Sequence, residues 1–286
     1  MQSAIRGVLI DVSGTVHVAD KAIPGAVKAL DRLRASGIPF RFCTNTTQTS
    51  GETLAKKLRD LGFNVNRNEI FTSLSACRQL VQSRKLRPLL FLEPDALQEF
   101  DGIPLSAPHD SVVIGLSPSN FNYDMMNKAF RILAYSERTE TPVTLIAIHK
   151  AMYFADKDNG TLSMGPGGFV EALEYASGIK AHVVGKPQKA FFELAIQNMG
   201  LSSSTPSASS SSISTSSTNI AMIGDDVEQD LGGGAAELGL VRFLVQTGKY
   251  RPRDEDRDAF GGLSGGTFAD FAAVVDHILK HNSVQG

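Results

Sequence analysis

The chain has 286 residues, of which 42% are hydrophobic and 20% are charged, a composition typical of a soluble globular protein. This length allows one or two domains. The formal net charge of −2 excludes the overall basic field that attracts nucleic acid. Two cysteines, Cys43 and Cys77, are too few for a disulfide framework, which favours reduced thiols.

The first residues, MQSAIRGVLIDVSG, lack the long apolar stretch of a secretory signal and reach an acid at Asp11. No apolar run in the sequence approaches the roughly 20 residues that a membrane-spanning helix needs. We therefore expect a cytoplasmic protein without a membrane partner.

The N-terminal part alternates between strand and helix signals. Apolar runs predict buried strands at 7–12 (GVLIDV) and 39–44 (PFRFCT). A helix is predicted between them, ending at Gly37, and its apolar face consists of Ala26, Val27, Leu30 and Leu33. Thr49 and Glu52 have the spacing of a capping box, which predicts the start of a second helix.

The middle of the chain, from about 77 to 182, has enough apolar residues for a small α/β domain. Three segments read as strands: LRPLLFLE, DSVVIGL and VTLIAIHK. Two segments read as helices: the stripe of Tyr123, Met126, Phe130 and Leu133, and the segment GPGGFVEALEYASG. This stretch is therefore predicted to be inserted between two parts of a larger domain.

The C-terminal part returns to the first pattern. Strands are predicted at 181–185, 219–224 and 240–246, and helices at 187–200 and 268–281. Strands that alternate with helices are the signature of a parallel sheet with crossover helices.

One segment fits neither pattern. Residues 202–218 include 11 serines and 3 threonines among 17 residues. Such a composition cannot bury a core, so a disordered insertion is expected.

Polar side chains follow four of the predicted strands. In a parallel α/β sheet, ligands bind beyond the carboxyl ends of the strands. If these four strands share one sheet, their ends bring together Asp11, then Thr44 and Asn45, then Lys186, and finally Asp225 and Asp226 with Asp230 shortly after.

This set of groups suits phosphoryl transfer through an aspartyl phosphate. A carboxylate and a phosphate dianion repel each other, so the attack needs a compensating positive charge. A Mg²⁺ ion held by carboxylates supplies that charge. Asp11 could bind the metal with one oxygen and attack with the other, and Asp225 could be a second ligand. Lys186 could supply positive charge, while Thr44 and Asn45 could donate hydrogen bonds to phosphate oxygens.

Four short motifs, DVSGT, CTN, VVGKP and IGDD, resemble the four motifs of the haloacid dehalogenase (HAD) superfamily of phosphohydrolases. The resemblance covers nearly the whole chain except 202–218, and the insert lies where that superfamily carries a C2-type cap. It implies a Rossmann-like α/β core with a parallel sheet, formed by 1–76 and 183–286, and an inserted α/β cap domain at 77–182.

The resemblance also implies roles for single residues. Asp11 would be the nucleophile and, with the backbone carbonyl of Ser13 and with Asp225, a Mg²⁺ ligand. Catalysis would rest on Asp11 and Lys186, and the substrate would be bound by Asp11, Val12, Ser13, Thr44, Asn45 and Lys186. Asp226 and Asp230 would be carboxylates outside the ligand set that orient the waters on the metal.

Ser13 departs from the commonest pattern of the superfamily, in which an aspartate at this place is the general acid and base. Two functions therefore stay open. One is a Mg²⁺-dependent phosphohydrolase for a small phosphorylated substrate such as pyrophosphate, a P–N compound or a phosphate with a good leaving group. The other is a phospho-ligand binding protein with little turnover.

A dehalogenase is disfavoured because it needs no metal, which would leave Asp225 and Asp226 without a purpose. A homodimer formed through the cap is a further expectation.

The serine-rich segment yields a first prediction. Replacing 202–218 by a short Gly-Ser linker should change the melting temperature and phosphate release little, because loop closure costs only about 0.6 kcal/mol per doubling of loop length. Thermal melting and a phosphate-release assay of the deletion variant check this. Loss of soluble protein or of most activity would contradict the expected absence of an ordered role.

Overall fold

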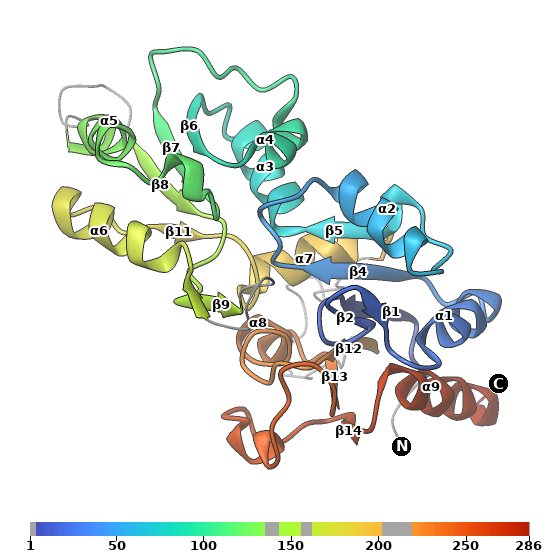
Figure 1. Cartoon of the computed structure of the whole chain (residues 1–286). Coiled ribbons are helices and arrows are strands. Elements are labelled where there is room, and N and C mark those ends of the chain that lie inside the picture. The colour runs from blue at the N-terminus through green and yellow to red at the C-terminus, as the bar shows by residue number, and fades with distance from the viewer. Residues whose placement is uncertain (1–3, 135–142, 156–161, 202–218, 286) are drawn as a thin grey trace, which may run out of the picture. The chain divides into compact units, whose positions relative to one another are not determined.

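The computed structural model describes residues 4–134, 143–155, 162–201 and 219–285 (Figure 1). The predicted serine-rich insertion at 202–218 lies outside these residues. The chain divides into two compact units. Unit 1 comprises Met1–Thr44, Ala55–Phe71 and Lys186–Gly286, and unit 2 comprises Asn45–Leu54 and Thr72–Gly185.

Unit 1 is built on a six-stranded sheet in the order β14-β13-β12-β1-β4-β5. Its strands are β1 (Gly7–Asp11), β4 (Phe40–Thr44), β5 (Ile70–Thr72), β12 (Ile220–Gly224), β13 (Val241–Val245) and β14 (Gly266–Phe268). The pairs β12–β1, β1–β4, β12–β13 and β13–β14 are parallel. Every residue of β1, β12 and β13 is buried, which explains why these strands are apolar except for Asp11 and Arg242.

The helices of unit 1 lie in the sequence between strands of this sheet or, in the case of the last helix, after its final strand. They are α1 (Ala26–Ala35), α2 (Gly51–Asp60), α7 (Lys189–Asn198), α8 (Gly233–Glu237) and α9 (Phe271–Gln285). The helix α1 packs against α9, and Arg32 on α1 forms an ion pair with Asp276 on α9 at 2.8 Å. A small antiparallel hairpin, β2 (His17–Val18) and β3 (Lys21–Ala22), follows β1. The predicted strands at 7–12, 39–44, 219–224 and 240–246 are confirmed to within two residues at each end.

Unit 2 holds a second parallel sheet of four strands in the order β11-β8-β7-β6. Its strands are β6 (Pro88–Phe91), β7 (Ser111–Ile114), β8 (Thr144–Ala147) and β11 (His182–Val183), and an antiparallel pair is formed by β9 (Tyr153–Ala155) and β10 (Leu162–Met164). The helices are α3 (Ser73–Ser83), α4 (Pro94–Leu97), α5 (Tyr123–Ala134) and α6 (Gly167–Ser177). Short 3₁₀ helices cover Arg67–Glu69, Gln98–Phe100, Pro118–Asn120 and Asp254–Arg257 in the two units.

The strand predicted at 181–185 belongs to a different sheet from the one expected. It is the two-residue strand β11, which pairs with β8 through His182↔Ile146 and Val183↔Ala147. The four polar strand ends therefore do not share one sheet. A short apolar run identifies a strand but carries no information about its partner strand.

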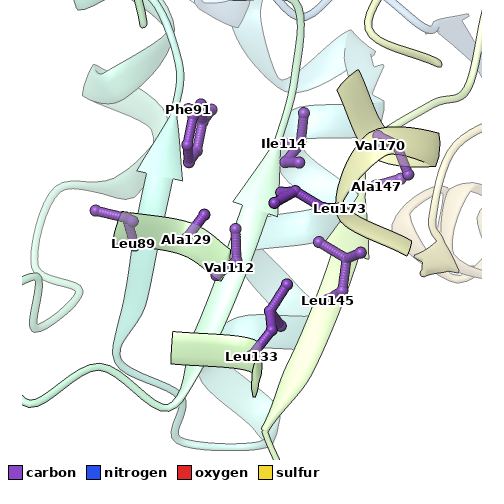
Figure 2. Packing of buried hydrophobic residues seen from close by; sticks show 10 residues of the cluster. All are labelled: Leu89, Phe91, Val112, Ile114, Ala129, Leu133, Leu145, Ala147, Val170 and Leu173. Carbon is purple, nitrogen blue, oxygen red and sulfur yellow. The ribbon is translucent and has the colours of Figure 1, made fainter. Parts of the chain in front are cut away.

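The core of unit 2 lies between its sheet and two helices (Figure 2). Alternate residues of three strands point to one face, as the period of two in a strand requires. The helices α5 and α6 lie over that face and contribute residues spaced four and three apart (Figure 2). The cluster consists of Leu89, Phe91, Val112, Ile114, Leu145, Ala147, Ala129, Leu133, Val170 and Leu173. Tyr123, predicted as part of the apolar stripe of α5, is instead 81% exposed because it starts the helix.

The start of α2 also differs from the prediction. The cap is Ser50 rather than Thr49, since the Ser50 hydroxyl oxygen accepts a bond from the Thr53 amide at 3.2 Å. Asp95 accepts a bond from the Ser50 amide at 2.7 Å, and Glu99 accepts one from the Gly51 amide at 2.7 Å. Carboxylates distant in sequence thus satisfy the free amides at this helix end, which a local pattern could not reveal.

Among the helices that the structure describes, none is both long enough and apolar enough to cross a lipid bilayer.

A buried carboxylate in α6 joins three segments of unit 2. Glu174 accepts bonds from the Ala181 amide at 2.8 Å and from the ammonium groups of Lys150 and Lys180, each at 3.2 Å. Burial alone would raise the pKa of Glu174, but the Ala181 amide and the two lysines outweigh it and lower that pKa below its ordinary value. The ionised form is therefore favoured by folding.

We expect Glu174→Gln to lower the free energy of unfolding by about 1–2 kcal/mol at neutral pH, since it removes a charge-assisted acceptor. Because the folded-state pKa lies below the ordinary value of about 4.3, this contribution is present above that pH and is lost as the pH falls through the folded-state pKa. Urea unfolding at neutral and acidic pH measures the difference between the two proteins. Glu171→Gln is the matched control, because Glu171 also pairs with Lys150 but is 62% exposed. A Glu174→Gln effect as small as the Glu171→Gln effect at neutral pH would contradict this account.

Candidate active site

Asp11 lies at the carboxyl end of β1 and is 6% exposed. Its Oδ1 accepts a bond from the ammonium of Lys186 at 2.6 Å, and its Oδ2 accepts one from the hydroxyl of Thr15 at 3.3 Å. Each carboxylate oxygen therefore has a donor from a different part of unit 1, so the carboxylate is held in one orientation.

The Lys186 ammonium is buried and bonded to three acceptors. Besides Asp11, it donates to Asp230 Oδ1 at 2.6 Å and to the backbone carbonyl of Cys43 at 3.0 Å. A lysine ammonium has three N–H donors, so all of them are engaged by the protein. Burial would lower the pKa of Lys186, but Asp11 and Asp230 raise it, so this group stays charged.

Three acids follow β12. Asp225, 1% exposed, accepts a bond from the Lys249 amide at its Oδ2, at 2.6 Å. Asp230 Oδ2 accepts a bond from the Asp226 amide at 3.2 Å. The Asp226 carboxylate accepts bonds from the amides of Glu228 and Gln229 and from the Lys249 ammonium at 3.1, 3.0 and 3.2 Å, which makes it the cap of this turn.

Negative charge is concentrated at this end of the sheet. One carboxylate oxygen from each of Asp11, Asp225 and Asp230 lies within 4.8 Å of the others, and all three residues are buried. Burial first and the neighbouring Asp11 next raise the pKa of Asp225 to about 8 and that of Asp230 to about 6. With all three carboxylates ionised, the cluster would carry more negative charge than Lys186 offsets.

The donor set suits a small divalent cation. Asp225 Oδ1 is buried and has no hydrogen-bond partner among the residues that the structure describes. An unpaired buried carboxylate oxygen costs free energy unless something binds it. Hard oxygen ligands are those that Mg²⁺ prefers, and the two nearby carboxylates supply more of them. The residues present therefore fit the ion that the HAD resemblance implies.

The other predicted site residues are placed as follows. Thr44 ends β4, and the adjacent Cys43 pairs in register with Asp11. Val12 is fully buried, and its carbonyl oxygen accepts a bond from the Val16 amide at 3.1 Å. Ser13 is exposed beside Asp11. Asn45 is the first residue of unit 2.

Asp230, which the resemblance implies to be a carboxylate outside the ligand set, is bonded to Lys186 and lies in the carboxylate cluster. Its role toward a metal ion stays a prediction. Thr15 and the Cys43 carbonyl were not predicted to take part, and the segment 247–250 (TGKY) was interpreted only as a loop beside the site. Thr15 closes the motif DVSGT and so had a signal in the sequence. The other contacts join segments about 140 and 230 residues apart, for which a single sequence has no signal.

His17 and His149 each have ring nitrogens within hydrogen-bond distance of nearby groups. A ring nitrogen of His17, Nδ1, lies 2.9 Å from the Ala19 carbonyl oxygen, and burial lowers the pKa of this imidazole. In unit 2, His149 Nδ1 accepts a bond from the Ala151 amide at 3.3 Å, and Nε2 lies 3.3 Å from the Thr47 hydroxyl.

Comparisons with known proteins identify the family of this chain. Residues 8–104 match the family model described as haloacid dehalogenase-like hydrolase, and residues 183–264 match a second model of HAD-like hydrolases. Haloacid dehalogenase-like hydrolase domain-containing protein 2 from Bos taurus is 45% identical over 97% of both chains. The chain belongs to the haloacid dehalogenase-like hydrolases. The predicted resemblance and its assignment to this family of enzymes are thus confirmed.

Two further similarities concern named phosphatases. The phospholysine phosphohistidine inorganic pyrophosphate phosphatase of Danio rerio is 36% identical over 97% of this chain and 96% of its own. The crystal structure of the 4-nitrophenylphosphatase of Thermotoga maritima has a TM-score of 0.80 at 21% identity, covering 96% of this chain and 97% of that one. The predicted α/β fold, a parallel-sheet HAD core with an inserted second α/β part, is confirmed.

Proposed function

We propose that this HAD-family protein is a Mg²⁺-dependent phosphohydrolase that acts on a small phosphorylated substrate through an aspartyl phosphate. The observation that carries the proposal is the buried cluster in which Lys186 holds Asp11 while Asp225 Oδ1 has no hydrogen-bond partner among the described residues. A nucleophilic carboxylate, a fixed cation and a free carboxylate oxygen are the parts that this chemistry requires.

In the proposed reaction, one oxygen of Asp11 forms a bond to phosphorus while the bond from phosphorus to the leaving group breaks. The electron pair departs with the leaving-group atom. Lys186 and Thr15 hold the carboxylate so that it need not reorganise before the attack. Water then attacks the aspartyl phosphate, which releases inorganic phosphate, gives a proton to the solvent and restores Asp11.

Mg²⁺, held by Asp11, Asp225 and the Ser13 carbonyl, would supply the positive charge that offsets repulsion between the carboxylate and the phosphate. Lys186 adds a fixed positive charge to the nucleophile, and its contact with Asp230 keeps it in place. Asp226 shapes the turn that carries both Asp225 and Asp230. Thr44, Asn45, Val12 and Ser13 are the remaining proposed substrate contacts.

We further infer that unit 1 is the catalytic core and that unit 2 is the cap that selects the substrate. Both the cytoplasmic location and a homodimer through the cap stay predictions of the sequence. The relatives named as phosphatases of pyrophosphate, P–N and aryl substrates support the proposed substrate classes for this chain.

Asp11→Asn should abolish phosphate release because an amide is a poor nucleophile and a poor Mg²⁺ ligand, while its shape preserves the fold. Phosphate release with and without Mg²⁺, together with circular dichroism, checks this. Asp31→Asn, the same change at an exposed position of α1, is the control. Asp11→Asn with normal turnover would refute the nucleophile. A wild-type protein that binds phosphate without turnover would instead favour the phospho-ligand binding protein.

The serine at position 13 predicts a preference among substrates. An alkyl monoester must expel an alkoxide, comparable to hydroxide with a conjugate-acid pKa of about 15.7, and a general acid would speed this step about 10²–10⁴-fold. Pyrophosphate instead expels inorganic phosphate, a far weaker base than an alkoxide, so it can leave as an anion without a general acid. We therefore expect kcat/KM to be higher for pyrophosphate, P–N and aryl substrates than for glycerol phosphate.

Ser13→Asp should narrow this difference, since it restores a carboxylic acid at the exposed position beside Asp11. Steady-state kinetics on one substrate of each class measures the ratio for both proteins. Equal kcat/KM for pyrophosphate and glycerol phosphate in the wild type would show that another residue supplies the proton.

A further inference from the structure

The segment Thr247–Gly248–Lys249, which follows β13, contacts both parts of the chain that carry the proposed metal ligands. The Thr247 hydroxyl donates a hydrogen bond to the Gly14 carbonyl at 2.5 Å. Two residues later, the Lys249 amide donates to Asp225 Oδ2 at 2.6 Å. This short segment thus connects the loop after β1 with the acid after β12, and nothing in the sequence motifs assigns it a role.

The backbone packs so closely around Asp225 Oδ2 that neither Gly14 nor Gly248 could carry a side chain. Gly14 has a φ of +97°, and a Cβ there would lie 1.9 Å from this oxygen. Gly248 has a φ of +59°, and its Cβ would lie 2.2 Å from the same oxygen and 2.3 Å from Gly14 Cα. Two backbones without side chains therefore enclose Oδ2, and the other oxygen, Oδ1, is the one left without a hydrogen-bond partner.

The Ser13 carbonyl is oriented in a similar way. The Gly14 amide donates to the His17 carbonyl at 2.8 Å. Because a trans peptide is planar and its C=O points opposite to its N–H, this bond sets the direction of the Ser13 carbonyl. The next carbonyl, that of Gly14, is held by the Thr247 hydroxyl. Both peptides that flank Gly14 are thus fixed.

We propose that Thr247 is a positioning residue for the metal centre. Its hydroxyl holds the loop of Ser13 and Gly14 against the turn at Gly248, so that the Ser13 carbonyl and Asp225 Oδ1 keep one relative position. This inference rests on the proposed Mg²⁺ site and extends it to a residue outside the ligands. Residues that orient metal ligands typically contribute about 10–100-fold to metal affinity.

Thr247→Val removes the hydroxyl donor and keeps the branched shape of a half-buried side chain. Isothermal titration of the full-length, metal-free protein with Mg²⁺, without substrate, should show an affinity roughly 10–100-fold weaker than in the wild type. Thr247→Ser retains the hydroxyl and should restore the wild-type affinity. Thr267→Val makes the same chemical change on β14, two strands away from β12, and should bind Mg²⁺ as the wild type does.

Thermal melting of the metal-free proteins separates positioning from general stability. A variant Thr247→Val that melts at a lower temperature but binds Mg²⁺ with wild-type affinity would overturn the inference and leave the proposed function intact. A wild-type protein that binds no Mg²⁺ would overturn both. Should Thr247→Val fail to fold, Thr247→Ala removes the same donor without adding bulk, and its Mg²⁺ affinity decides the question in the same way.

Discussion

The ion pairs of Lys186 with Asp11 and Asp230 are the interaction on which the rest of the site depends. Both N–O distances are 2.6 Å, and the three side chains are almost completely buried. Moving charged groups out of water costs free energy. Their mutual attraction offsets this cost only when every donor and acceptor has a hydrogen-bond partner. Lys186 meets that condition, since its three N–H groups reach two carboxylates and a backbone carbonyl. Asp225 does not meet it, because its Oδ1 lies buried without a hydrogen-bond partner in the described part of the chain.

This imbalance has a functional consequence. A cluster with more negative charge than the protein neutralises is unfavourable by itself and favourable for a bound cation. The cost appears in the raised pKa values of Asp225 and Asp230, whose cause is burial first and the neighbouring Asp11 next. In unit 1 this cluster lies at the ends of strands, β1 and β12, that are buried throughout. Shifted pKa values of this kind are common at sites that bind ligands and carry out catalysis.

The placement of Asp225 comes from backbone groups, in contrast to Asp11 and Asp230, which side chains hold. Gly14 and Gly248 approach Asp225 so closely that no Cβ fits at either position. The Thr247 hydroxyl then joins two loops that are 233 residues apart in sequence, and the Lys249 amide holds Asp225, 24 residues before it. Such contacts restrict movement without adding charge, so the negative potential at the site is preserved.

Much of this protein follows from local patterns in its sequence. The strands of unit 1 were predictable because a strand buried on both faces is a nearly continuous apolar run, as in GVLI and IAMIG. The acids at the strand ends could be chosen as candidate site residues because ligands bind at the carboxyl edge of a parallel sheet. The motifs around Asp11, Lys186 and Asp225 also resemble those of one superfamily. These features depend on spacing of a few residues, which a single sequence records directly.

The tertiary structure decided those features in which a strand or side chain bonds to a partner that is distant in the sequence. Apolar spacing could not reveal that the strand before Lys186 pairs with β8, so that this lysine follows a strand of the second sheet. It could not reveal that Asp230 bonds to Lys186, that Ser50 rather than Thr49 caps α2, or that Lys249 holds Asp225. The physical reason is common to all of them: side-chain type limits which bonds a residue can form, but only the folded chain brings the other partner within reach.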